Sequence, residues 1–350
     1  PVPASSNYGY VFEWNGYYAP RALQRVLEAG LLASVATKPF TATTTSGPIA
    51  LTRGSILVPL DRQTKSREDI WETLQSVAAD DGITVHSLVS GRSATGTAGV
   101  DLGGPSFRPI KQPNALLVVG REINLYDAGE IWHLLDYRMN MPLTLRDRDR
   151  LSGINWNDYT HIVFPHGDYD NFEPEFADRL RLWVAEGGTL IGMRNAAPWV
   201  RATTLDWVDP ESEVAPTVEA EEEEEPAGRS PYAGKDSKEA NTVVGGAIFT
   251  ADLDNTHPLG FGYDRRNIFL HKNYKEPMAP TDNPWATVIA YDEQPVFSGF
   301  VSTDNEVALA GTAALIAERA GAGSIILFAD NPNFRGYWYG TNKLFLNAIF

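Results

Sequence analysis

Cysteine is absent from the 350-residue sequence. Without it, the chain has no disulfide, no thiolate nucleophile and no cysteine-ligated zinc site. Histidine is scarce, with six residues, and none of them begins the zinc-binding pattern H-x-x-E. The patterns H-E-x-x-H, G-x-S-x-G, G-x-G-x-x-G and the Walker P-loop are missing as well. We therefore expect no catalytic residue of these families and no metal or other cofactor in this chain.

Long apolar runs are also missing. No segment approaches roughly 18 uninterrupted apolar residues, the length that indicates a membrane-spanning helix, so we expect no membrane span. The sequence has no initiator Met and no signal peptide, and it ends inside the helix-like apolar pattern LFLNAIF (344–350). We interpret the chain as a piece of a longer protein.

Basic residues are outnumbered, and the net charge of −16 argues against a nucleic-acid partner. The acidity is concentrated between Asp206 and Glu225, so the rest of the chain carries only about −6. The run Glu221–Glu225 could collect calcium weakly. It lacks the spaced oxygen ligands of a calcium site, and a solvated loop is the favoured interpretation.

The apolar periodicity predicts an α/β protein with two lobes. Strand-like and helix-like segments alternate over 1–112, which gives an N-terminal α/β lobe. Residues 113–350 give a second lobe, in which short apolar runs alternate with amphipathic helices. This pattern predicts a doubly wound, mostly parallel sheet of the flavodoxin type. A polar stretch at 206–240 is predicted to be an acidic loop insertion in that second lobe.

Several segments carry these predictions. The polar stretch 41–47 is read as a loop, and Ser66 is expected to cap a helix over 66–82. The segment 306–321 is predicted to be a helix that leads into a strand at 324–330.

The stretch GMRNA (192–196) follows a predicted buried strand, at the kind of turn where many α/β enzymes place a nucleophile. Together with VFPHGDY (163–169), it resembles class I glutamine amidotransferases, which carry a G-x-C-x-G elbow at this point. In this sequence Arg194 stands in the cysteine position. In the later phrase FADN (328–331), Ala329 and Asn331 stand in the positions of the family's His and Glu. A guanidinium stays protonated and has no lone pair to offer, so the resemblance implies the fold without the chemistry.

A wider resemblance rests on the phrases YDAGEIWHLLD (126–136), GVDLGGPS (99–106), NTHPLGFGY (255–263) and FADNPNFRGYWYGTNKLFLNAIF (328–350). Together they resemble the C-terminal region of bacterial secreted zinc carboxypeptidases of the carboxypeptidase A-like family. The resemblance implies a secreted or periplasmic parent that removes C-terminal residues from peptides. It also implies that the zinc belongs to a separate catalytic domain, the expected partner of this chain.

A binding site is predicted at the carboxyl edge of the second sheet, where α/β proteins bind ligands. His166 and Asp168 follow one strand, Arg194 follows another, and Asp330 and Asn331 follow a third. Arg194 could hold a carboxylate or phosphate of a ligand. The favoured alternative is that Arg194 pairs internally with Asp168 or Asp330.

Two further groups have a functional and a structural interpretation. Glu130 and His133 are three residues apart on one helix, with Asp127 and Asp136 on neighbouring turns, and could share a metal. No second such pair exists, so a structural hydrogen-bond network is favoured. The aromatic residues of NFRGYWYG (333–340) could stack on a sugar or a peptide, although packing is the more frequent role of such residues.

These observations lead to three hypotheses. The first is a non-catalytic accessory region of a zinc carboxypeptidase, which supports stability, assembly or substrate presentation. The second is a carbohydrate- or peptide-binding module at the edge around Arg194. The third is a hydrolase with an unrecognised serine or carboxylate site.

Overall fold

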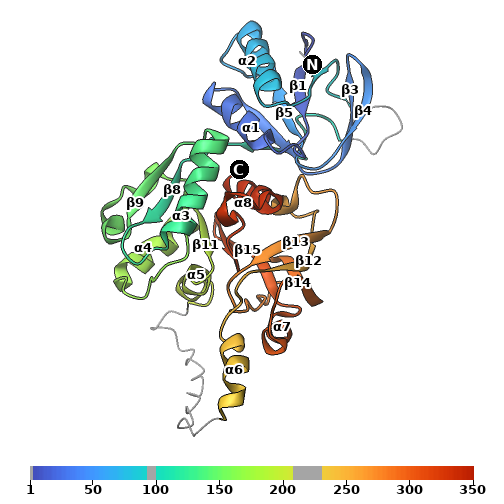
Figure 1. Ribbon diagram of the computed structural model, residues 1–350. Helices are drawn as coiled ribbons and strands as arrows, with labels where there is room; N and C mark the ends of the chain where they lie inside the picture. Colours follow the sequence, from blue (N-terminus) through green and yellow to red (C-terminus); the bar gives the residue numbers. More distant parts are fainter. Residues whose placement is uncertain (1–2, 93–99, 208–230) are drawn as a thin grey trace.

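The structure is a computed structural model that describes residues 3–92, 100–207 and 231–350. Its helices and strands build a mixed α/β protein with two sheets (Figure 1). The run Glu221–Glu225 and most of the predicted insertion at 206–240 lie outside these residues. The described end of the insertion contains helix α6 (Lys235–Asn241), so the prediction of a loop was wrong there. Among the described residues, no helix has the length and apolarity needed to cross a membrane.

The first sheet has seven strands in the order β4-β3-β6-β1-β5-β2-β7, and every neighbouring pair is antiparallel. Its strands are β1 (Gly9–Phe12), β2 (Ala33–Ala36), β3 (Phe40–Thr44), β4 (Gly47–Leu51), β5 (Ile56–Pro59), β6 (Val85–Leu88) and β7 (Phe107–Ile110). Strand–helix alternation would produce parallel pairs, but the described strands of the N-terminal lobe form only antiparallel ones.

Two helices pack on one face of this sheet. Helix α1 (Ala19–Glu28) and helix α2 (Arg67–Asp80) share a core with Tyr10 and Phe12 of β1. Val11 points to the opposite face, as the two-residue period of a strand requires. The predicted cap of α2 is confirmed, because the Ser66 side chain accepts from the backbone N–H of Asp69 at 3.1 Å in a full capping box.

The second sheet has nine strands in the order β13-β12-β14-β15-β16-β11-β10-β8-β9. Its strands are β8 (Ala115–Val119), β9 (Leu143–Asp147), β10 (His161–Phe164), β11 (Thr189–Met193), β12 (Ala247–Leu253), β13 (Asn267–Lys272), β14 (Thr287–Ser298), β15 (Ala313–Ala320) and β16 (Gly323–Phe328). Neighbours from β16 to β9 are parallel, and neighbours from β13 to β16 are antiparallel. The prediction of a mostly parallel sheet was therefore wrong for half of its strand pairs.

Most helices of this lobe flank the parallel half of the sheet. They are α3 (Leu125–Trp132), which continues as the π-helix η1 (His133–Arg138), α4 (Pro174–Ala185), α5 (Ala196–Thr204) and α8 (Asn342–Ile349). Helix α7 (Thr303–Leu309) instead packs against β14 in the antiparallel half. Helix α5 packs against β11 on the side of Gly192, where an added Cβ would lie 3.0 Å from a Val200 methyl. Helix α8 packs on Phe328 from the other side, with the rings of Phe328 and Phe345 6.4 Å apart.

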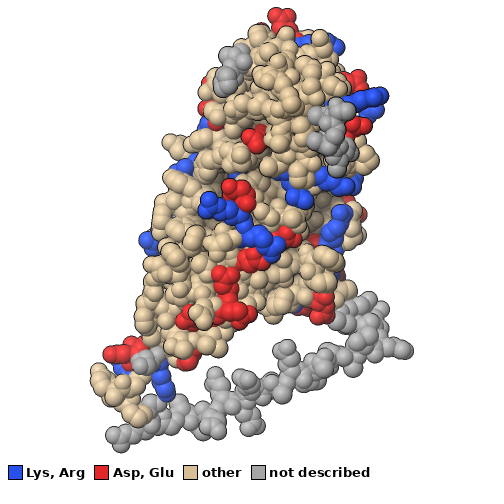
Figure 2. Space-filling model, turned by 90° about the vertical axis from the view of Figure 1, so that its right-hand side faces the viewer, with Lys and Arg blue, Asp and Glu red and all other residues tan. Residues whose placement is uncertain are grey.

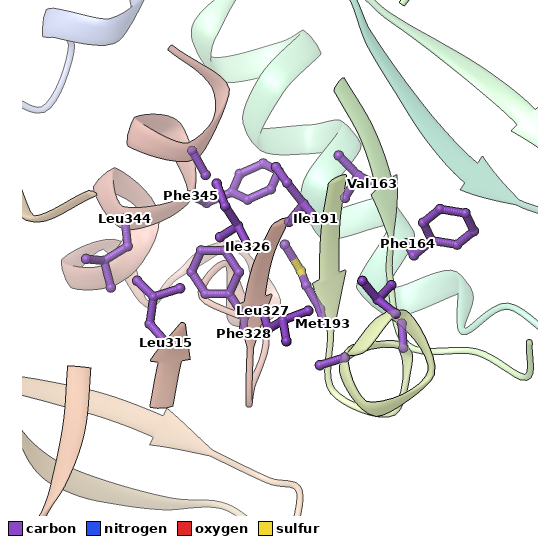
Figure 3. Packing of buried hydrophobic residues seen from close by; sticks show 14 of the residues in the cluster. Val163, Phe164, Ile191, Met193, Leu315, Ile326, Leu327, Phe328, Leu344 and Phe345 are labelled. Atoms are coloured by element: carbon purple, nitrogen blue, oxygen red, sulfur yellow. The ribbon is translucent and has the colours of Figure 1, made fainter. Parts of the chain in front are cut away.

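Buried apolar side chains from β10, β11, β15, β16 and α8 converge in one cluster at the centre of the second lobe (Figure 3). Parallel strands that are covered on both faces are expected to be apolar throughout, and β10 and β11 follow this rule. This packing fixes the carboxyl ends of β10, β11 and β16, from which the predicted site residues follow.

Helix α8 also joins the two lobes. Trp14, which follows β1, donates its indole N–H to Asn347 Oδ1 at 2.6 Å, and Asn347 Nδ2 donates to the carbonyls of Leu259 and Phe261 at 2.7 and 2.9 Å. The ammonium of the buried Lys343 donates to the carbonyls of Trp14 and Gly16. On the face shown in Figure 2, acidic and basic side chains are interspersed over the surface of the protein.

Candidate functional site: a strained turn occupied by an ion pair

The elbow after β11 is present as a sharp strand-to-helix turn. Arg194 has the left-handed backbone angle φ of 54°, and its N–H donates to the Phe328 carbonyl of β16 at 2.9 Å. A non-glycine residue rarely adopts this region, so the turn stores strain. Gly192 permits it, because an added Cβ would also lie 3.2 Å from the Ala197 Cα of α5.

The Arg194 side chain pairs with Asp127 in the first turn of α3. Its Nη1 donates to Asp127 Oδ2 at 3.1 Å, and the exposed fractions of the two side chains are 12% and 6%. Nη2 reaches the Asn273 carbonyl at 3.5 Å, and the guanidinium carbon lies 5.2 Å from the centre of the Tyr274 ring. The Arg194 side chain is thus held by α3 and by the segment 273–274, which is typical of a structural anchor.

Asn331 connects this ion pair to Glu130. Its Nδ2 donates to Asp127 Oδ1 at 2.9 Å and to Glu130 Oε2, while Glu130 Oε1 accepts from the backbone N–H of Arg335 at 2.7 Å. We call Arg194, Asp127, Asn331 and Glu130 the elbow network. It joins the ends of β11 and β16 to α3.

Glu130 has an unusual proton affinity within this network. Burial, with a further contribution from the neighbouring Asp127 carboxylate, raises the pKa of Glu130 to about 7, against the hydrogen bond from Arg335 and the charge of Arg194. The network thus contains a carboxyl group that changes its protonation state near neutral pH.

The partner predicted for Arg194 was wrong. Asp168 is exposed, and its Oδ1 accepts from the N–H of Asp170 at 3.0 Å, which holds it in its own turn. Asp330 accepts from Lys272 Nζ at 2.9 Å and from the Tyr291 hydroxyl at 2.7 Å, and all three of these side chains are buried. Each of these aspartates therefore forms its hydrogen bonds with residues other than Arg194.

His166 lies beside the elbow, as its place after β10 predicts. Its ring is 5.8 Å from the ring of Tyr274, the residue that also faces Arg194. Burial and the nearby Arg194 charge lower the pKa of His166, which favours its neutral form. Its buried Nδ1 has no hydrogen-bond partner among the described residues.

The crevice between β8 and β10, where such sheets often bind ligands, is closed by the loops that follow the two strands. Ile123 forms an antiparallel bridge with Gly167, the N–H of Asn124 donates to the His166 carbonyl at 2.8 Å, and that of Asp168 donates to Glu122 at 3.0 Å. A ligand site at this edge must therefore lie beside α3 and not between the two strands.

An open cleft of about 870 Å³ lies at that place. The start of α3 and the segment 334–336 form two of its walls, and Arg194 lies in its floor with Asp127 and Glu130. His133 and Arg138 enter the cleft from the π-helix η1. The sequence placed Asp127 beside Glu130 in an expected hydrogen-bond network but did not pair it with Arg194, and it did not single out Arg138. One helix period does not show which side chain meets a distant turn.

The aromatic residues of 333–340 divide between packing and exposure. Phe334 stacks on His271 with ring centres 3.6 Å apart, whereas Tyr337 and Tyr339 are 54% and 46% exposed. The Tyr339 hydroxyl accepts from Arg138 Nη2 at 2.7 Å. His133 stacks on Tyr137 at 5.2 Å, and no set of three metal-ligating side chains lies together in the part of the chain that the structure describes.

Comparison with known proteins leaves the family open. No family model and no curated protein matches the chain. Solved structures with partial similarity include a putative ThuA-like protein from Parabacteroides merdae (11% identity, 68% of this chain and 88% of that chain, TM-score 0.37) and an exo-β-1,4-mannosidase from Opitutaceae bacterium strain TAV5 (11%, 67% and 35%, TM-score 0.31). A β-galactosidase from Bacillus circulans is similar at 12% identity over 67% of this chain and 30% of that chain, with a TM-score of 0.30. This chain spans about a third of the length of these two glycosidases, and none of the three TM-scores reaches 0.5.

Proposed function

We propose that this chain is a non-catalytic module built on an amidotransferase-like scaffold. The observation that carries the proposal is the elbow network, in which Arg194 is paired with a buried Asp127. The sequence resemblance to amidotransferases aligns Arg194 with the nucleophile of that family. The strand order β9-β8-β10-β11-β16, which places the second strand of the lobe outside the first, supports a flavodoxin-like, doubly wound parallel half. Neither Arg194 nor Asn331 can act as a nucleophile or general base.

The carboxylates of the network argue against a hydrolase. Asp127 and Glu130 both accept from the same Asn331 amide, so this amide fills the space between them. A glycosidase needs that space for the scissile bond or a water molecule. Glu130 has the raised pKa of a general acid, but Asp127 is the only other carboxylate among the described residues that line the cleft, and the Asn331 amide bridges the two.

As a module, the chain would serve the catalytic domain of a larger protein. The resemblance to secreted zinc carboxypeptidases leads us to propose that this partner is a zinc-dependent carboxypeptidase domain in the same secreted or periplasmic parent, which the module stabilises, assembles or supplies with substrate. Zinc would be bound by that domain alone. A full-length parent whose folding, oligomeric state and peptide kinetics are unchanged after deletion of 113–350 would contradict this accessory role.

The absence of catalysis is tested directly on the purified chain. We expect no turnover of glutamine, p-nitrophenyl acetate or p-nitrophenyl glycosides by the wild-type chain or by Arg194→Ala. The matched control is Arg179→Gln, an exposed arginine on α4. Turnover that disappears in Arg194→Ala and persists in Arg179→Gln would overturn the proposal.

A second candidate function, a binding module, is favoured by the cleft beside α3. The cleft has a polar floor and two exposed apolar side chains on its rim, Leu125 and Tyr126, which are 71% and 84% exposed. A large cavity with a few convergent polar groups is the usual form of a small-molecule site. A peptide and a sugar are the two ligand classes that the sequence suggested for it.

A further inference from the structure

The charges in the cleft beside α3 are unbalanced in favour of arginine. Arg138, Arg194 and Arg335 line it, against two acids, Asp127 and Glu130. Arg194 is neutralised by Asp127. The cleft is therefore positive in a chain whose net charge is −16.

Two of these arginines have no carboxylate partner among the described residues. Arg138 donates to the Tyr339 hydroxyl and lies 4.5 Å from the centre of that ring, and its buried Nε has no hydrogen-bond partner in the described part of the chain. Arg335 is exposed, and its guanidinium carbon lies 5.1 Å from the centre of the Phe334 ring. Arg335 leaves the edge of its guanidinium open to a ligand, because its contact with the Phe334 ring uses the face of the group. Arg138 is more fully engaged, since its Nη2 donates to the Tyr339 hydroxyl and the Gly336 carbonyl and Tyr17 is a further hydrogen-bond partner, so it offers the cleft its charge and its remaining Nη1 donor.

The two arginines are held near one another. Arg138 Nη2 reaches the Gly336 carbonyl at 3.4 Å, and Gly336 follows Arg335 in the chain. Arg335 has the left-handed φ of 48°, which directs its N–H to Glu130 and fixes the segment against α3. His133 lies beside this segment, since an added Cβ on Gly336 would stand 3.4 Å from His133 Nδ1.

We propose that this cleft binds an anionic group, a carboxylate or a phosphate, through Arg138 and Arg335, with the aromatic or apolar part of the same ligand against Tyr126 and Phe334. Arginine suits this role because its fork of N–H donors matches the oxygens of either anion. The inference rests on the binding function proposed above and names its ligand class. Arg194 does not contact the ligand in this proposal, since its guanidinium is already paired with Asp127.

The test uses three small probes on the whole chain: benzoate, phenyl phosphate and the neutral analogue benzamide. Binding is followed by calorimetry and by the shift in thermal midpoint at millimolar probe concentrations. We expect benzoate or phenyl phosphate to bind, with an affinity that falls as salt is added, and benzamide not to bind. The stronger of the two anions identifies a carboxylate or a phosphate as the natural group.

The variants Arg335→Gln and Arg138→Gln are each expected to weaken anion binding about tenfold, the loss of one charge-assisted hydrogen bond. Arg335 is exposed, so its variant leaves the fold intact, and Arg179→Gln on α4 is the matched control with unchanged affinity. Equal binding of benzamide and benzoate, sensitive to Tyr126→Ala, would reject the anionic class and keep the cleft as a binding site. If no probe binds, both the anionic ligand class and the use of the cleft as a binding site are rejected.

Discussion

An arginine in a strained strand-to-helix turn acts through its charge, because its guanidinium neither attacks a carbonyl nor accepts a proton at neutral pH. At position 194 that charge is directed at Asp127, with both side chains largely removed from water. Removing one partner of such a pair leaves the other charge buried and uncompensated. The residue therefore holds α3 to the ends of β11 and β16.

Glu130 gives the network a dependence on pH. Its pKa in the folded chain is raised to about 7 from the ordinary 4.5, so the folded state holds this proton more tightly than the unfolded state. The contribution of Glu130 to stability is complete below pH 4.5 and is lost as the pH rises toward 7. We predict that Glu130→Gln, measured by urea unfolding across this range, removes that part of the pH dependence.

The test compares the pH dependence of the free energy of unfolding of the wild type with that of Glu130→Gln. The free energy of unfolding of the wild type, minus that of Glu130→Gln, should decline from pH 4.5 to 7 and stay level above it. Two curves that run parallel over the whole range would show that Glu130 titrates normally.

At the scale of one residue, the sequence located Arg194 at an elbow but did not identify its partner. Asp127 is 67 positions away and shares a helix with Glu130 and His133, so periodicity alone offers several acids for the same arginine. The sequence favoured Asp168 and Asp330 as partners of Arg194 because they follow neighbouring strands. Their own short-range bonds, to Asp170 and to Lys272 with Tyr291, decide against them.

At the scale of the element, the elbow depends on how closely α5 approaches β11. A Cβ at position 192 would meet Val200 and Ala197 at 3.0 and 3.2 Å. We predict that Gly192→Ala displaces α5 and lowers the free energy of unfolding by about 1–3 kcal/mol. The control is Gly129→Ala within α3, where an added Cβ has no atom within 4 Å. This change should raise the free energy of unfolding by about 0.5–1 kcal/mol. Equal effects of the two changes in urea unfolding would contradict this account of the turn.

The elements that the sequence predicted well are those with a strong period and clear ends. Helix α2 has its cap at Ser66, and β11 (Thr189–Met193) is the buried strand predicted before the elbow. The prediction of a helix over 306–321 was wrong beyond Leu309. Gly311 has φ of 69°, and the following residues form β15, between β14 and β16. Alanine, glutamate and arginine favour a helix, but pairing with two distant strands outweighs that preference.

The hairpin of β3 and β4 shows the opposite error. Its threonines made 41–47 look like a polar loop, yet β-branched residues favour strands, and the turn falls at Thr45–Ser46 before Gly47 with φ of 107°. Long-range strand order in either sheet depends on contacts that no local pattern contains. This is why the antiparallel half of the second sheet was not predicted.

At the scale of the whole molecule, α8 couples the two lobes through Asn347. Its side chain accepts from the Trp14 indole and donates to two carbonyls in 259–261. We predict that Asn347→Ala costs about 2–4 kcal/mol, because it leaves several buried polar groups without a partner. It should also separate the unfolding of the first sheet from that of the second.

Hydrogen exchange of β1 and β11, followed in the same samples, measures this coupling. The wild-type chain should lose protection in both strands together, and the variant should lose it in β1 first. Simultaneous loss in the variant at the wild-type midpoint would show that the lobes are held together elsewhere.

The most direct test of the central claim is a double-mutant cycle on the ion pair at the elbow, measured as free energies of unfolding in urea. Arg194→Ala and Asp127→Ala should each lower the free energy of unfolding by about 3–5 kcal/mol, because each leaves the other charge buried without its partner. The double variant should cost no more than either single change. If the cost of the double variant equals the sum of the two single costs to within about 0.5 kcal/mol, the account is contradicted, because Arg194 and Asp127 then act independently.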